Sequence, residues 1–172
     1  MFKNVEHLVF RIPLSTSSVS HLVILLSNWS KISTLIFVGH LTSDEQVTIA
    51  ECINNLEQLT RLDLRLEFNF DLLRPNLRRV HHLSVGFKLS HDALRDVFPH
   101  IGPHCNRLWI KQPRFPNSSL NILLSWVKSN VSLFNRLTHF GCSSNIDEDA
   151  LQFIDSRFTS LRVWYIAGET TG

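Results

Sequence analysis

The sequence has little of what membrane insertion or secretion requires. Its longest aliphatic run is residues 22–26, far short of the roughly 20 apolar residues of a membrane-spanning helix. A secretory signal peptide would be apolar near the start of the chain, where Glu6 and His7 stand instead. We therefore expect an intracellular protein, cytoplasmic or nuclear, that makes no contact with a membrane.

Motifs of catalysis and nucleotide binding are also missing. Only six of the 172 residues are glycine, and they form neither a glycine-rich phosphate loop nor the G-x-S-x-G turn of a serine hydrolase. The sequence thus predicts a protein that is not an enzyme. We expect no catalytic residues, no cofactor and no small-molecule substrate.

Cysteine and histidine are too scattered to predict a metal site. The cysteines, Cys52, Cys105 and Cys142, form no C-x-x-C pair, and we expect them to be small buried thiols. His100 and His104 lie close to Cys105 in the sequence, but no second ligand pair at zinc spacing accompanies them. We expect this cluster to be a solvated turn without a metal ion.

One pattern recurs seven times. In each copy an apolar residue or cysteine is followed three positions later by a second and two positions later by a third. The copies are Val5/Leu8/Phe10, Ile32/Leu35/Phe37, Leu59/Leu62/Leu64, Val80/Leu83/Val85, Cys105/Leu108/Ile110, Leu137/Phe140/Cys142 and Leu161/Trp164/Ile166. Residues two apart in a strand share one face, so each copy predicts a short strand with one buried face.

The segments between the copies predict helices. Ser43 precedes Gln46 by three residues, the spacing of a capping box, and an apolar stripe follows. The residues of this stripe are Val47, Ala50, Ile53 and Leu56. Further helices are expected within 90–101 and 117–129 and from residue 146 onward, whereas the short segment 67–76 predicts a turn or a 3₁₀ piece.

The order of these elements predicts the fold class. A strand that returns through a helix pairs parallel with its predecessor, so the seven strands form one parallel sheet. Steps of 21 to 32 residues between the copies are close to the period of leucine-rich repeats. We expect an α/β solenoid of about seven repeats, with the sheet on a concave face and the helices on a convex face. It would span residues 1–172 as one domain.

Two segments resemble a known class of repeat. Residues 142–151 read C-x-x-x-I-D-E-x-A-L and are followed by L-x-x-W-x-I at 161–166. Residues 89–94 read L-S-H-D-A-L and are followed by C-x-x-L-x-I at 105–110, and 41–47 is a looser third copy. These segments resemble the cysteine-containing, ribonuclease-inhibitor-like repeats of F-box leucine-rich-repeat proteins.

The resemblance implies a protein-binding horseshoe. In F-box proteins such repeats are the substrate-recognition part of a ubiquitin ligase. The L-P-x-E-[IL] start of an F-box is not found before the first repeat, so the adaptor-binding role is not carried onto any residue. Because no capping helix is expected before Val5, we expect the chain to be part of a longer array. An F-box upstream would make the whole a ligase subunit; without one, a scaffold or an inhibitor is equally open.

The outward side chains of the strands predict the binding site. They include His82, His139 and, on the last strand, Val163 and Tyr165, with Tyr165 expected in the same row as Trp109. Five of them are Arg or Lys and only Asp63 is acidic, although Asp63 stands between two arginines and takes up part of their charge. We expect the concave face to bind an acidic segment of another protein. The residues expected to carry this binding are Arg61, Arg65, Arg107, Trp109, Lys111, Tyr165 and Ile36.

Two alternatives remain at the level of sequence. In the first alternative, the face is a solvated surface without a ligand. In the second, it binds nucleic acid, since basic residues together with aromatics are typical of surfaces that bind single-stranded nucleic acid. The isoelectric point of about 8.6 and the small number of basic residues disfavour nucleic acid.

Overall fold

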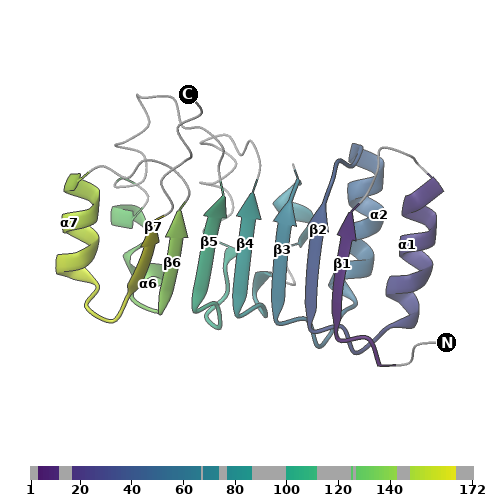
Figure 1. Cartoon of the computed structure of the whole chain (residues 1–172), viewed down its shortest axis with the longest axis horizontal. Coiled ribbons are helices and arrows are strands. Elements are labelled where there is room, and N and C mark those ends of the chain that lie inside the picture. The colour runs from purple at the N-terminus through teal and green to yellow at the C-terminus, as the bar shows by residue number, and fades with distance from the viewer. Residues whose placement is uncertain are drawn as a thin grey trace.

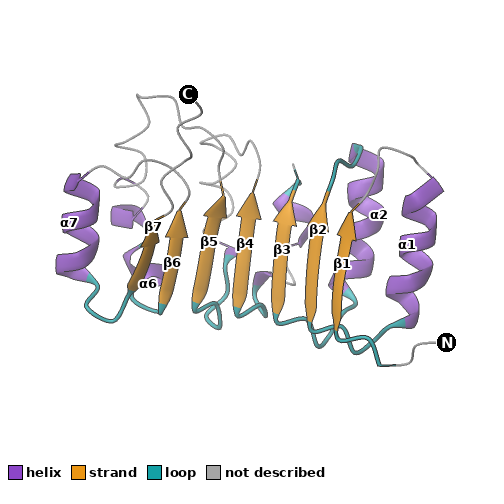
Figure 2. Ribbon diagram, in the orientation of Figure 1, coloured by secondary structure: helices purple, strands orange, loops and turns teal. Residues whose placement is uncertain are grey.

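The computed structural model describes residues 4–11, 17–66, 68–73, 77–86, 100–111, 125, 127–142 and 148–165. Strands and helices alternate along this part of the chain, except that β5 follows β4 with no described helix between them (Figures 1 and 2). The elements are β1 (His7–Arg11), α1 (Ser17–Asn28), β2 (Thr34–Val38), α2 (Ser43–Asn54), β3 (Arg61–Arg65), the 3₁₀ helix η1 (Phe70–Leu73), β4 (His82–Gly86), β5 (Arg107–Lys111), α6 (Val131–Phe134), β6 (His139–Cys142), α7 (Glu148–Arg157) and β7 (Arg162–Tyr165).

The strands of the described residues form one seven-stranded sheet in the order β1 to β7. Every neighbouring pair is parallel, and each strand pairs with the strand that follows it in the sequence. Parallel strands require a crossover between them, and between β1 and β2 it contains α1 and between β2 and β3 it contains α2. The predicted α/β class and the parallel sheet are confirmed.

The register matches the recurring pattern across β1 to β6 and departs from it at β7. One row of paired residues contains the middle member of the first six copies, from Leu8 to Phe140. At β7 the partner of Phe140 is Val163 and not Trp164. Tyr165 therefore pairs with Cys142, and the expectation that it shares the row of Trp109 is wrong.

One hydrophobic core lies between the sheet and the helices. Leu35 and Phe37 of β2 are fully buried and belong to the same cluster as Leu22 of α1 and Ile53 of α2. Val9, which points to the other side of the sheet, is 59% exposed. The helices thus cover one face of the sheet, and the opposite face, called here the open face, is the one available to a ligand.

Helix α2 begins one residue earlier than expected. Its N-cap is Thr42, whose hydroxyl accepts from the Glu45 backbone N–H at 3.4 Å while the Glu45 carboxylate accepts from the Thr42 N–H at 2.8 Å. Both this pair and Ser43 with Gln46 have the spacing of a capping box. The Glu45 carboxylate is a stronger hydrogen-bond acceptor than the Gln46 amide, and the helix dipole favours its negative charge. Thr42 is therefore the N-cap, and Ser43 is not.

One of the residues in the apolar stripe predicted for α2 is not buried. Ala50 and Ile53 are buried as expected, and Leu56 is buried just beyond the helix. Val47 is 44% exposed, and Ile49 takes the buried place instead. Valine and isoleucine are both strongly hydrophobic, so hydrophobicity alone did not show which of Val47 and Ile49 would be buried.

The remaining helix predictions have mixed outcomes. Segment 67–76 contains the expected 3₁₀ piece, η1. The helix expected within 90–101 and most of the one expected within 117–129 lie outside the described residues. Helix α7, given as Glu148–Arg157, lies in the segment expected to be helical from residue 146 onward, and its Ile154 is buried. In the described ranges no helix has the length and apolar character needed to cross a membrane.

Candidate binding site on the open face

The first residues of the seven strands form a row of basic side chains. Parallel pairing aligns them, and six of the seven are Arg or His. In order along the sheet they are His7, Thr34, Arg61, His82, Arg107, His139 and Arg162. This basic row lies on the open face, since in β1 to β6 the residue that follows it packs into the hydrophobic core, and Arg162 is the register partner of His139. Arg61, Arg107 and Arg162 are exposed.

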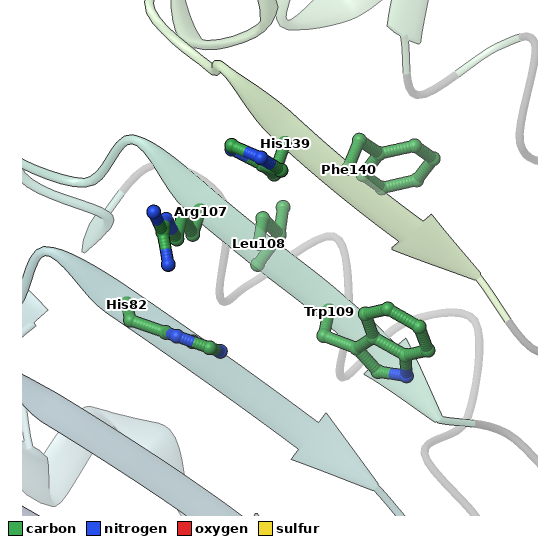
Figure 3. A pocket seen from close by; sticks show the side chains of 6 residues that line it. All are labelled: His82, Arg107, Leu108, Trp109, His139 and Phe140. Carbon is green, nitrogen blue, oxygen red and sulfur yellow. The ribbon is translucent and has the colours of Figure 1, made fainter. Parts of the chain in front are cut away.

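A pocket lies beside the centre of the basic row. It has a volume of about 390 Å³ and spans β4, β5 and β6. Its lining residues are His82, Arg107, Leu108, Trp109, His139 and Phe140. Figure 3 shows the side chains of His82, Arg107 and His139 at the first positions of three neighbouring strands, with the Trp109 indole further along β5. The pocket therefore combines an aromatic wall with three basic side chains.

Gly141 explains how the Trp109 indole can lie flat on the sheet. Gly141 is the register partner of Trp109 on β6. A Cβ atom at position 141 would lie only 2.6 Å from Cζ3 of the indole. Any other residue would displace the ring, so glycine on β6 provides the space that the aromatic wall of the pocket occupies.

Two polar atoms near the pocket are buried without a partner. Trp109 Nε1 and Ser84 Oγ have no hydrogen bond within the part of the chain that the structure describes. Ser84 is only 1% exposed and pairs with Trp109 across β4 and β5. A buried polar group that lacks a partner costs about 1–3 kcal/mol, so both atoms lower the stability of this part of the sheet.

Arg65 and Asp63 form an internal ion pair on β3. Arg65 Nη2 lies 3.0 Å from Asp63 Oδ2, and Arg65 Nε is 3.3 Å from the same oxygen. Asp63 is almost fully buried, whereas 45% of the Arg65 side chain is exposed. As expected from the sequence, part of the arginine charge on β3 is used inside the protein. Among the residues that the structure describes, Arg61 forms no such ion pair.

The other predicted binding residues occupy different parts of the open face. Ile36 lies between Val9 and Asp63 in the middle row of the sheet, two strands from the nearest strand of the pocket. Lys111 is paired with Gly86 at the far end of β5. Tyr165 occupies the register position of Cys142. Of the seven predicted residues, the pocket thus contains Arg107 and Trp109.

Sequence reasoning did not select His82, His139 and Arg162. His82 and His139 were expected to face outward, but single histidines carry no binding signal of their own. The expected β7 register did not place Arg162 on the outward side. Only the alignment of the strands reveals that all three lie in one row with Arg107.

Metal chemistry has no support on this face or elsewhere in the described ranges. Within those ranges no three His, Cys, Asp or Glu side chains come together in a way that could hold an ion. His100 lies 3.8 Å from Asp71, and the ring of His104 lies 5.9 Å from that of His81. These contacts join neighbouring segments and do not form a cluster of ligands.

Cys105 is expected to react slowly with thiol reagents. Burial raises the pKa of its thiol to about 11, and the thiolate is the reactive form. Burial raises the pKa of Cys52 as well, but Cys52 is only partly buried. With iodoacetamide at pH 8, mass spectrometry of the native protein should show Cys52 labelled at least about tenfold faster than Cys105. Raising the pH from 8 to 9 should increase the labelling rate of Cys105 about tenfold, because the thiolate fraction rises about tenfold per pH unit below the pKa. Equal native rates, with equal rates also in urea, would contradict the burial of Cys105.

Comparison with known proteins gave no match to a protein-family model, to a curated protein or to a solved structure. The site is therefore interpreted from its own residues.

Proposed function

We propose that this chain is a protein-interaction module of the leucine-rich-repeat type. Its open face binds an acidic segment of a partner protein. The observation that carries the proposal is the pocket at Trp109, in which an aromatic wall is bordered by Arg107, His82 and His139. Aromatic and arginine side chains together are typical of the centres of protein interfaces.

The arrangement of the strands supports the repeat type. Register partners such as Leu62 and Leu83, or Leu108 and Phe140, are 21 and 32 residues apart in the sequence. A sheet whose strands pair in sequence order at such intervals is the arrangement expected of stacked repeats. In such proteins the exposed sheet face is an extended binding surface.

The cellular role follows from the resemblance to F-box leucine-rich-repeat proteins. We propose that the module selects the substrate of an F-box type ubiquitin ligase. A scaffold or an inhibitor built from the same repeats would use the same face, so the residues of the site do not depend on this choice.

Peptide selection tests the proposed function. We expect a random peptide library, selected on the whole chain, to yield acidic peptides with an apolar residue. Arg107→Glu should weaken their binding at least tenfold in fluorescence polarisation, because the substitution reverses the charge at the centre of the basic row. Trp109→Ala should weaken it to a similar extent by removing the aromatic wall of the pocket.

A matched control separates local from general charge effects. Arg157→Glu makes the same charge change on an exposed residue of α7, and it should leave binding within about twofold. Acidic peptides that bind all variants equally would contradict a site at the pocket. Selective binding of single-stranded oligonucleotides, weakening steeply with salt, would replace the proposal with a nucleic-acid site.

A further inference from the structure

Arginine and histidine alternate along the basic row from β3 to β7. The sequence of side chains is Arg61, His82, Arg107, His139 and Arg162, one from each successive strand. Neighbouring strands lie about 4.8 Å apart, so consecutive arginines in the row are separated by about 9.6 Å. The row therefore presents guanidinium groups at a regular interval of two strands.

The three arginines are available to a ligand. Each is exposed, and none of them forms a side-chain ion pair or hydrogen bond within the described ranges of the chain. Arg65, the other exposed arginine of β3, is instead held by Asp63 at 3.0 Å. The regular spacing thus belongs to the residues whose charge remains unneutralised.

We propose, on the basis of the proposed function, that the acidic partner segment lies across the strands in a polyproline II conformation. It carries an acidic side chain at every third residue. A polyproline II chain has three residues per turn and rises about 3.1 Å per residue, so every third side chain returns to the same edge after about 9.3 Å. This repeat matches the arginine interval of about 9.6 Å to within a few tenths of an ångström per step.

The shortest same-face spacings of a strand and of a helix do not match the row. In an extended β-strand, side chains on one face recur every two residues, or about 6.6 Å, which is about 6 Å out of step by the third arginine. An α-helix places the side chains of successive turns on one face about 5–6 Å apart, which is about 8 Å out of step by the third arginine. A polyproline II segment also leaves its backbone carbonyls free, because it has no internal hydrogen bonds.

The pocket supplies the second part of the recognition. Trp109 lies two residues beyond Arg107 on β5, so it is beside the row at its central arginine. An apolar residue adjacent to the central acidic residue would pack against the indole, as aromatic grooves do with polyproline II ligands.

Peptides of one composition test the spacing. Nine-residue fluorescent peptides carry three glutamates, one leucine next to a glutamate, and proline or alanine elsewhere. The glutamates stand at positions 1, 4 and 7, at 1, 3 and 5, or at 3, 4 and 5. On the whole chain we expect the 1, 4, 7 peptide to bind at least tenfold more tightly than the other two.

Variants at the ends of the row assign that preference to the arginines. Arg61→Gln and Arg162→Gln should each weaken the 1, 4, 7 peptide by about three- to tenfold and affect the clustered peptide less, whereas Arg157→Gln on α7 should change neither. Circular dichroism of each variant confirms that it is folded.

The outcomes separate the two proposals. Equal affinity of wild type for all three peptides, lost in Arg107→Glu, would overturn the three-residue spacing and leave the acidic-segment site in place. No binding of any acidic peptide to the folded wild type would overturn both.

Discussion

Replacing Phe140 with alanine is expected to lower the free energy of unfolding by about 3–5 kcal/mol. Phe140 is fully buried on β6. Its ring packs edge-on against Phe134 of α6 at 5.1 Å between centroids, and Phe134 lies 5.8 Å from Phe158 just after α7. Removing the ring leaves a cavity between the sheet and two helices, which cannot close without moving both. Urea denaturation followed by circular dichroism measures the change.

Phe153→Ala is the matched control for Phe140→Ala. Phe153 belongs to the same aromatic group, 6.4 Å from Phe158, but it is only partly buried on α7. Since less apolar surface is lost and water can fill the space, we expect a loss of about 1–2 kcal/mol. If the two variants were equally stable, the aromatic group would not hold this end of the sheet together.

Gly102→Ala is expected to lower the free energy of unfolding by about 3 kcal/mol, the upper end of the usual cost of overpacking. A Cβ atom at position 102 would overlap the backbone of Arg78, including its carbonyl oxygen and Cα. A flexible side chain could move aside, whereas a backbone segment cannot. Gly102 N–H also donates to the Leu77 carbonyl at 2.8 Å, and the displaced chain would lose this hydrogen bond.

Asn106→Ala tests whether the Gly102 effect is steric. Asn106 is exposed shortly before β5, and its backbone oxygen accepts from Thr138 and His139. The backbone bonds persist in the alanine variant, so its stability should stay within about 0.5 kcal/mol of wild type. Wild-type stability of Gly102→Ala would show that the two segments do not approach so closely in solution.

The strands were the part of the fold that the sequence predicted best. In copies such as Leu59/Leu62/Leu64 the apolar residues alternate with charged ones, so only one register buries the apolar face. The last copy lacks this contrast. Val163, Trp164, Tyr165 and Ile166 are all apolar or aromatic, and either alternation could be assigned to the core. The pairing of Val163 with Phe140 decides between them, and the sequence pattern does not contain it.

The candidate site was predictable in part for a related reason. Arg107 and Trp109 stand out within one strand, and both line the pocket. The alternation of arginine and histidine runs perpendicular to the chain, so it appears only when strands far apart in the sequence are aligned. The burial of Asp63 was equally hidden, since a carboxylate in a strand is normally expected on the exposed face.

The pairing of each strand only with its neighbours in the sequence also bears on how the chain folds. The longest interval between paired residues, from Leu108 to Phe140, is 32 positions, and most are shorter. The entropy of closing a loop rises only with the logarithm of its length, so no single pairing in this sheet is much slower to form than another. We therefore expect folding to start at any adjacent pair and to spread one strand at a time, faster than is usual for a sheet of this width.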